Sequence, residues 1–232
     1  MPLHYVHIVA VTAFLSLLAG LFAAFEVEAE GKYGWGEKFP TWYRTSGPVA
    51  KLYKLTTNKP LTGYHAALFF VPILVFLWPM IYLGHLTAAG FVGAFALYFA
   101  WVTVWDYGWF CLNPSYRPSG FQRRNVWWFS REPWVIDRFP VGYLYGWIVA
   151  LVLAALSGWL DGGLFNRLGA QAFQLGCYLV YVALLITVLG PLYRRYHAYM
   201  RRDGNSHDER HLAGIFHKMK VVVTGNTNAG DA

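Results

Sequence analysis

Five stretches of the chain consist almost entirely of hydrophobic residues, and polar residues gather between them. The stretches cover residues 5–25, 64–85, 88–112, 141–160 and 170–192. Each is close to the roughly 20 residues that a helix needs to cross a bilayer. The pattern therefore predicts an all-α, polytopic membrane protein with five transmembrane helices in residues 1–192. The first stretch is interpreted as a retained helix, because the preceding MPLH lacks the basic residues of a signal peptide.

The basic residues predict how these helices are oriented. With five spans, the connections 26–63 and 113–140 and the segment 193–232 lie on one side of the membrane. All 19 Lys and Arg residues except Arg167 fall on that side. The positive-inside rule makes it the cytoplasmic side. We therefore expect the N-terminus outside and the C-terminus in the cytoplasm.

The composition agrees with a membrane protein and narrows the range of partners. Of the 232 residues, 56% are hydrophobic and only 13% are charged, whereas soluble domains carry about 25% charged residues. These values exclude a soluble globular enzyme and a disordered chain, and two cysteines exclude a disulfide scaffold. The formal net charge of +7 predicts contact with the lipid bilayer's anionic headgroups on the cytoplasmic face. Without a nucleic-acid motif, it does not predict a nucleic-acid partner.

Two segments outside the apolar stretches predict shorter helices. In the basic cytoplasmic tail, residues 193–232, Ser206 and Glu209 have the spacing of a capping box. Apolar residues on one face then predict an amphipathic helix at about 207–220, lying on the inner membrane surface. In the first connection, Pro48 begins the sequence PVAKLYKL, which predicts a short interfacial helix.

The fourth apolar stretch carries a small residue at every fourth position. These residues are Gly142, Gly146, Ala150, Ala154 and Gly158. Membrane helices associate through such close backbone contact, so the stripe predicts a tight helix seam. The seam either packs within the chain, which we favour, or contacts another subunit.

Aromatic residues make up 19% of the chain and gather near the predicted cytoplasmic boundary. Trp101, Trp105 and Trp109 are spaced four residues apart, and Trp127, Trp128, Phe129 and Trp134 follow. They predict an aromatic belt at the inner interface. The alternative is a platform for a flat apolar ligand such as a pigment, a quinone or a lipid.

Acidic residues and a histidine are expected at the same boundary. Asp106 lies within the third stretch, Glu26 and Glu30 follow the first, and His65 begins the second. If the first helix continues to residue 30, Glu26 and Glu30 share a face, because residues four apart are neighbours on a helix. Two carboxylates, a histidine and a further carboxylate predict a divalent metal site with oxygen and nitrogen ligands. Asp106 and His65 are also the candidate catalytic residues, as acid–base groups near the headgroups.

A simpler alternative remains for these groups. Glu26 and Glu30 would be solvated, and Asp106 would pair with an interfacial arginine such as Arg123 or Arg124.

A separate cofactor site is predicted at His7, near the start of the first stretch, and His85, at the end of the second. Histidines at one depth can ligate haem or a chlorophyll-type pigment. We favour a divalent metal over these, because no haem motif is present.

Three blocks of sequence carry a resemblance. They are EVEAEGKYGWGEKFPTW (26–42), KPLTGYH (59–65) and WDYGWFCLNPSY (105–116). They resemble a group of uncharacterised bacterial multi-pass membrane proteins, over about the first half of the chain. The resemblance implies the bacterial cytoplasmic (inner) membrane as the location, without an assigned activity. In that group an acidic residue often precedes the equivalent of Asp106, where this chain has Trp105, so the resemblance implies a non-catalytic relative.

These observations lead to two functional hypotheses. The first is a structural or accessory subunit of a bacterial inner-membrane complex, which contacts other membrane subunits through its fourth helix and interfacial aromatic residues. The second is a membrane-embedded enzyme, metal-dependent, that acts on a lipid-like substrate at the cytoplasmic interface. A transporter is less favoured, because no internal repeat is evident.

Overall fold

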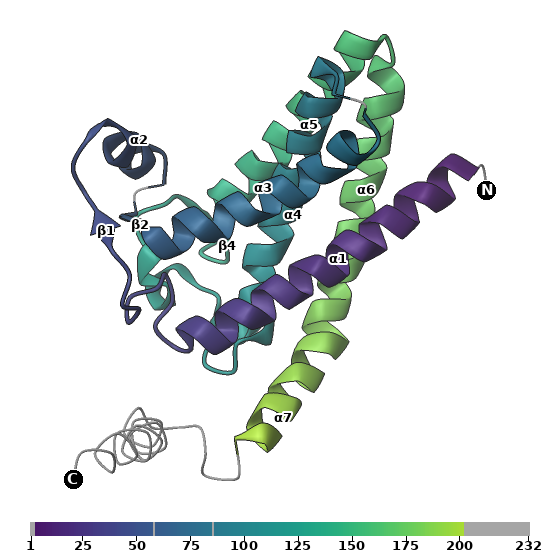
Figure 1. Cartoon of the computed structure of the whole chain (residues 1–232). Coiled ribbons are helices and arrows are strands. Elements are labelled where there is room, and N and C mark those ends of the chain that lie inside the picture. The colour runs from purple at the N-terminus through teal and green to yellow at the C-terminus, as the bar shows by residue number, and fades with distance from the viewer. Residues whose placement is uncertain (1–2, 58, 85, 202–232) are drawn as a thin grey trace, which may run out of the picture. The chain divides into compact units, whose positions relative to one another are not determined.

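The computed structural model describes residues 3–57, 59–84 and 86–201 (Figure 1). The chain divides into a first unit that ends at Gly190 and a second that begins at Pro191. The first unit contains the helices and connections that form the candidate site. The predicted tail helix at 207–220 lies outside the described residues.

Five helical segments among the described residues are long and apolar enough to cross a membrane, as expected. In the first unit they correspond to α1 (Leu3–Glu30), α3 (Gly63–Tyr82), α4 (Ala88–Leu112), α5 (Val141–Asp161) and α6 (Leu164–Leu184). A π-helical segment, η4 (Leu185–Leu189), and α7 (Gly190–Met200) follow α6 in the chain. The structure is therefore mostly helical and consistent with a multi-pass membrane protein.

Two helices differ most from their predicted bounds, while α3 ends at Tyr82 rather than at residue 85. The helix α1 continues past residue 25 to Glu30, because the sequence EVEAE contains strong helix formers. Gly31 then ends it with a left-handed backbone conformation, at φ +58°. The helix α6 begins at Leu164 rather than at residue 170. Its first two turns include the polar residues Asn166 and Arg167. A prediction from hydrophobic runs therefore placed the start of this helix too late.

Short elements fill the two long connections. The predicted interfacial helix is present as α2 (Pro48–Thr57). Two-residue strands form two antiparallel pairs, β1 (Tyr43–Arg44) with β2 (Leu61–Thr62) and β3 (Trp134–Val135) with β4 (Phe139–Pro140). The second connection also contains three 3-10 turns, η1 (Pro118–Gly120), η2 (Arg123–Asn125) and η3 (Trp127–Phe129).

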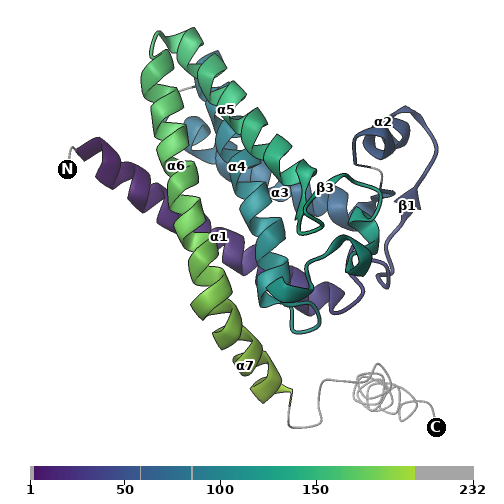
Figure 2. The ribbon, with the colours of Figure 1, turned by 180° about the vertical axis from the view of Figure 1, so that it is seen from behind.

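The helix α4 is central to the first unit and packs against α5, α1 and α3 (Figures 1 and 2). Part of the small-residue stripe of α5 faces α4, whereas Gly158, at its end, faces the start of α6. A Cβ atom added at Gly146 would lie 2.6 Å from the Thr103 hydroxyl, and Ala150 is fully buried. The Ser157 hydroxyl donates to the Ala89 carbonyl at 2.7 Å. The small-residue seam therefore serves helix packing within the chain.

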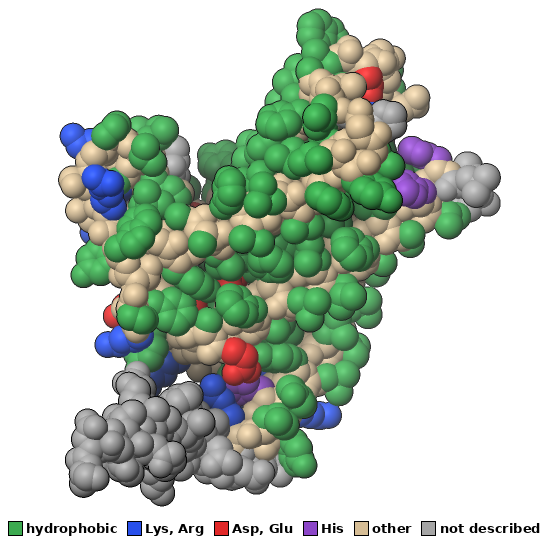
Figure 3. Space-filling view, viewed as in Figure 1, with side chains coloured by type: hydrophobic (Ala, Val, Ile, Leu, Met, Phe, Trp, Pro, Cys, Tyr) green, Lys and Arg blue, Asp and Glu red, His purple; other side chains and the backbone are tan. Residues whose placement is uncertain are grey.

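The tryptophans of α4 lie inside the protein rather than on its outer surface. Trp101, Trp105 and Trp109 are at most 4% exposed. The Trp101 indole donates to the Leu15 carbonyl at 2.8 Å, which ties α4 to α1. Aliphatic and other aromatic side chains cover much of the outer surface (Figure 3). The aromatic residues thus gather where the sequence predicts, but this part of the cluster is core.

Candidate metal centre

The last turns of α1 carry two carboxylates into the protein. Glu26 and Glu30 share a helix face, and each is only 8% exposed. The end of α1 is held in place by α4, because the Asn113 side chain donates to the Gly31 carbonyl at 2.7 Å. Asn113 is itself fully buried. The alternative of solvated glutamates is therefore wrong for this structure.

The loop after α1 folds back over these carboxylates. Gly34, Trp35 and Gly36 all have positive φ values, between +49° and +69°. This conformation costs a bulky residue such as Trp35 free energy, and it directs the Gly36 N–H to Glu30 Oε1 at 2.7 Å. It also stacks the Trp35 ring on His65, with centroids 3.9 Å apart. The loop thus positions one carboxylate and one imidazole.

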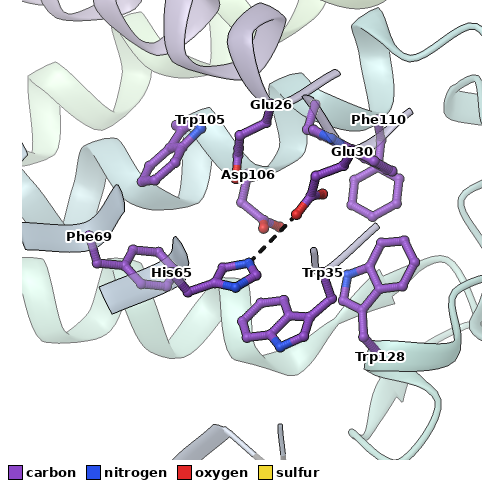
Figure 4. A pocket seen from close by; sticks show the side chains of 10 residues that line it. Glu26, Glu30, Trp35, His65, Phe69, Trp105, Asp106, Phe110 and Trp128 are labelled. Carbon is purple, nitrogen blue, oxygen red and sulfur yellow. Dashed lines mark ion pairs between the residues drawn. The ribbon is translucent and has the colours of Figure 1, made fainter. Parts of the chain in front are cut away.

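His65 is oriented by the residue that caps its helix. The Thr62 hydroxyl accepts a hydrogen bond from the His65 backbone N–H at 3.1 Å and contacts Nδ1 of the ring at 2.7 Å. The other ring nitrogen, Nε2, then faces Glu30, with 3.7 Å between Nε2 and Oε1 (Figure 4). When Nδ1 donates its proton to Thr62, Nε2 has a free lone pair, as a metal ligand requires.

Glu26, Glu30 and His65 converge to metal-ligand geometry. One ligand atom from each lies within 4.8 Å of the others, and all three residues are buried. Bonds of about 2.0–2.2 Å place two ligands of one ion at most about 4.4 Å apart, so small shifts suffice to bind a metal. Together with Asp106 they line a cavity of about 20 Å³, which is the space that one water or one ion occupies.

Asp106 contacts this cavity from α4. Its carboxylate accepts a hydrogen bond from the Tyr143 hydroxyl of α5. The expected arginine partners are engaged elsewhere, because Arg123 donates to the Ser130 carbonyl and Arg124 donates to Gln122. The pairing of Asp106 with one of these arginines is therefore wrong for this structure.

Comparison of the chain with protein-family models finds no match. The comparisons with curated proteins and with solved structures find none either. The chemistry of the site's own residues is therefore the basis for a functional conclusion.

A buried lysine lies in the first connection, near the candidate metal centre. Lys59 is 7% exposed and forms an ion pair with Glu132 at 3.5 Å. Its ammonium also lies 4.5 Å from the centroid of the Trp35 ring. Burial lowers the pKa of Lys59, although the charges of Glu132 and Asp106 act in the opposite direction. Burial likewise raises the pKa of Glu132, and Lys59 opposes that shift.

Only one member of the histidine pair proposed for a haem or pigment lies among the described residues. His7 is exposed and lines a separate cavity of about 640 Å³, formed by the opposite ends of the helices. His85 lies outside the described residues. The candidate pigment site therefore stays a prediction.

Sequence reasoning missed several residues that support the site. They are Thr62, which orients His65; Trp35, which stacks on His65; Tyr143, which donates a hydrogen bond to Asp106; and the ion pair of Lys59 with Glu132. The glycines in GWG were a usable signal, because paired glycines allow the positive φ that the loop needs. The others depend on contacts between distant segments.

Proposed function

We propose that the protein is a membrane-embedded enzyme that depends on a divalent metal and acts on a lipid-like substrate. Glu26, Glu30 and His65 are the metal ligands, and Asp106 is the acid–base residue or a fourth ligand. One observation carries the proposal: three buried side chains of ligating type converge within 4.8 Å of one another.

The charge balance of the cavity supports a cation at this point. Glu26, Glu30 and Asp106 line it together with a single imidazole. Buried carboxylates are costly unless a cation or hydrogen bonds offset their charge. Two carboxylates and one imidazole suit Mn²⁺, Fe²⁺ or Zn²⁺ better than Mg²⁺, which prefers oxygen ligands alone.

The surrounding residues suit a reactive centre. Tyr143 holds the Asp106 carboxylate beside the cavity, so Asp106 can accept a proton from a group bound there. Tryptophans and phenylalanines form most of the remaining wall (Figure 4) and exclude bulk water. The indole N–H of Trp109 is buried in this wall without a hydrogen-bond partner among the described residues. It is a donor for an oxygen of the substrate.

The proposed location follows from the sequence. The distribution of Lys and Arg favours a cytoplasmic position for the ends of the helices that carry the site. The resemblance to bacterial multi-pass proteins favours the inner membrane. A metal centre at that depth faces the boundary between headgroups and hydrocarbon, where the polar linkages of lipids lie.

Metal analysis of the purified full-length protein tests the proposal. We expect about one equivalent of a transition metal per chain in the unaltered protein. The Glu26→Gln/Glu30→Gln variant removes two ligand charges while keeping side-chain size, and we expect it to purify without metal. Glu28→Gln, on the same helix but outside the cavity-lining set, is the matched control and retains the metal.

The proposal fails if the unaltered protein, supplied with Mn²⁺, Fe²⁺ and Zn²⁺ in turn, binds none of them. It also fails if the double variant binds as much metal as the control.

A structural or accessory subunit of an inner-membrane complex is the second candidate. Its supporting features were the α5 seam and the interfacial aromatic residues, and much of both is engaged within the chain. Exposed apolar side chains on α5, such as Ile148 and Val152, remain open to a neighbouring helix or to lipid. Co-migration with a large complex in mild detergent, without bound metal, would favour this candidate.

A further inference from the structure

An apolar groove lies between α1 and α3. Both helices pack against α4, with few contacts between them. The groove has a volume of about 550 Å³, and its lining includes Leu18, Leu21 and Phe25 from α1 and Tyr64, Leu68 and Val71 from α3. Leu21 and Phe25 are each 59% exposed. In helices that cross a membrane, such side chains face lipid.

One end of the groove adjoins the metal ligands along both helices. Phe25 precedes Glu26, and Tyr64 precedes His65. Because α1 runs toward the site and α3 runs away from it, Leu18 and Val71 mark the other end. Seven residues of helix separate the two ends, which corresponds to about 10 Å. The groove therefore extends from the level of the metal centre into the hydrocarbon region.

A single layer of aromatic side chains separates the groove from the metal cavity. Phe22 lines the groove and packs on Trp105, which lines the cavity, with ring centroids 5.4 Å apart. Tyr64 bridges the two spaces. Its ring lines the groove, and its hydroxyl, within electrostatic reach of Glu26 and Glu30, is buried without a hydrogen-bond partner among the described residues.

We propose that this groove binds a hydrocarbon chain of the lipid substrate, with the chain's polar linkage at the Tyr64 end beside the metal. The proposal deepens the proposed function and rests on it. The groove is lined by apolar surface and lies at the depth of the bilayer interior. Its occupant is therefore expected to come from the membrane. The free Tyr64 hydroxyl is a donor for the ester or ether oxygen that joins such a chain to its headgroup.

Photolabelling in vesicles tests this assignment. The full-length protein is reconstituted in phosphatidylglycerol that carries a diazirine in the ester-proximal half of one acyl chain, the part that the groove is long enough to hold. After irradiation, labelled residues are mapped by mass spectrometry. We expect Leu18–Phe25 and Tyr64–Val71 to be labelled about tenfold more than the α5 residues around Val152, as selective binding requires. Val152 is 60% exposed and serves as the lipid-facing reference.

A variant that fills the groove separates binding from general lipid contact. Ala67 lines the groove, and Ala67→Trp places an indole there. We expect labelling of both segments to fall to the level of α5, while the metal content is unchanged. Val152→Trp adds the same ring outside the groove and alters neither. Ala67→Phe is a smaller substitution that makes the same test if the Trp variant does not fold.

Two results would overturn the inference: uniform labelling of α1, α3 and α5 in the unaltered protein, or selective labelling that survives Ala67→Trp and Ala67→Phe. Selective labelling in a protein that binds no metal would instead support the groove as a lipid site while removing the proposed function. The metal content and the labelling pattern therefore report separately on the two proposals.

Discussion

The two ends of the helical unit contain similar residue types in different surroundings. At one end, Glu26, Glu30 and His65 are buried around a cavity of about 20 Å³. At the other, His4, His7, Asp161 and Arg167 line a space of about 640 Å³, and all four residues are exposed. The long connections fold over the first end, whereas Gly162 and Gly163 make a tight turn at the second.

The difference shows that the site depends on convergence and burial more than on the presence of ligating residues. At the open end, Asp161 pairs with Arg167 at 2.8 Å while both remain in contact with solvent. At the closed end, carboxylates face one another with water largely excluded. Charges in that environment interact more strongly, so substitutions there should have the larger effects.

The largest difference is expected for histidine substitutions at the two ends. His65→Ala removes one of the three proposed metal ligands. We expect metal affinity to fall about 1000-fold or more, beyond the 10–100-fold that loss of an orienting partner costs. His7→Ala is the control, because His7 is exposed and should leave the affinity unchanged. Chelator competition measures both. Equal affinities for the two variants would contradict the assignment of His65.

Two glycines with positive φ make the next comparison. A Cβ atom at Gly34, at φ +69°, would lie 2.3 Å from the Trp128 ring. At Gly162, at φ +76°, it would meet nothing within 4 Å. We expect Gly34→Ala to cost about 3 kcal/mol of folding free energy and Gly162→Ala about 1 kcal/mol. Thermal unfolding in detergent measures the difference, and similar losses would argue against the tight packing of the GWG loop.

The two ion pairs should differ in strength and in pH dependence. Glu132→Gln leaves the buried Lys59 ammonium without its partner, so we expect a loss of about 2 kcal/mol at pH 7. Asp161→Asn breaks a pair whose side chains are 31% and 51% exposed, so we expect a much smaller loss, because solvent screens exposed ion pairs.

The pH dependence follows from the lowered pKa of Lys59. The cost of burying the ammonium is present at pH values below the folded-state pKa. It disappears as the pH rises toward the unfolded-state value of about 10.4, because the folded lysine loses its proton first. The Glu132→Gln loss should therefore shrink between pH 7 and 9.5. The Asp161→Asn loss should stay constant, because the hydrogen bond from Arg167 lowers the pKa of Asp161 and the carboxylate is ionised at both pH values. Unfolding curves at both pH values that show a constant Glu132→Gln loss would contradict this account.

The smallest difference in folding stability is expected for two threonine caps. Thr62 caps α3 and Thr87 caps α4 through equivalent hydrogen bonds, so each Thr→Ala change should cost about 1 kcal/mol. Only Thr62→Ala should also weaken metal binding, by about 10–100-fold, because Thr62 orients His65. Thr62→Ser should restore the affinity. A cap that acted only on helix stability would leave metal binding the same in all three variants.

Much of the fold could be predicted from the apolar runs. The order of these runs along the chain also predicted which residues of the site lie at the same end of the helices. Once the spans were placed, the end of the first and the start of the second had to share a membrane face, which brings Glu26 and His65 to one level. The burial of Trp101 could not be predicted in this way. Lipid and protein interiors are equally apolar, so hydrophobicity does not distinguish a lipid-facing residue from a core residue.

The fine structure of the site depends on contacts that no local pattern encodes. Two of these contacts join segments that are distant in the sequence. They are the hydrogen bond from Tyr143 to Asp106 and the ion pair of Lys59 with Glu132. They form only after the connections fold over the helix ends. The GWG loop is the exception, since its glycines indicate an unusual backbone even though the stacking of Trp35 on His65 does not follow from them.

The residues of the site come from α1, α3 and α4, which are synthesised at different times. Glu26 and Glu30 leave the ribosome before His65, and Asp106 follows them by roughly 75 residues, which corresponds to about 4–15 s of synthesis. During that interval the carboxylates lack the helix that buries them. If the site binds a metal as proposed, loading should follow the synthesis of α4, and a chain truncated after α3 would retain Glu26, Glu30 and His65 without the helix that encloses them.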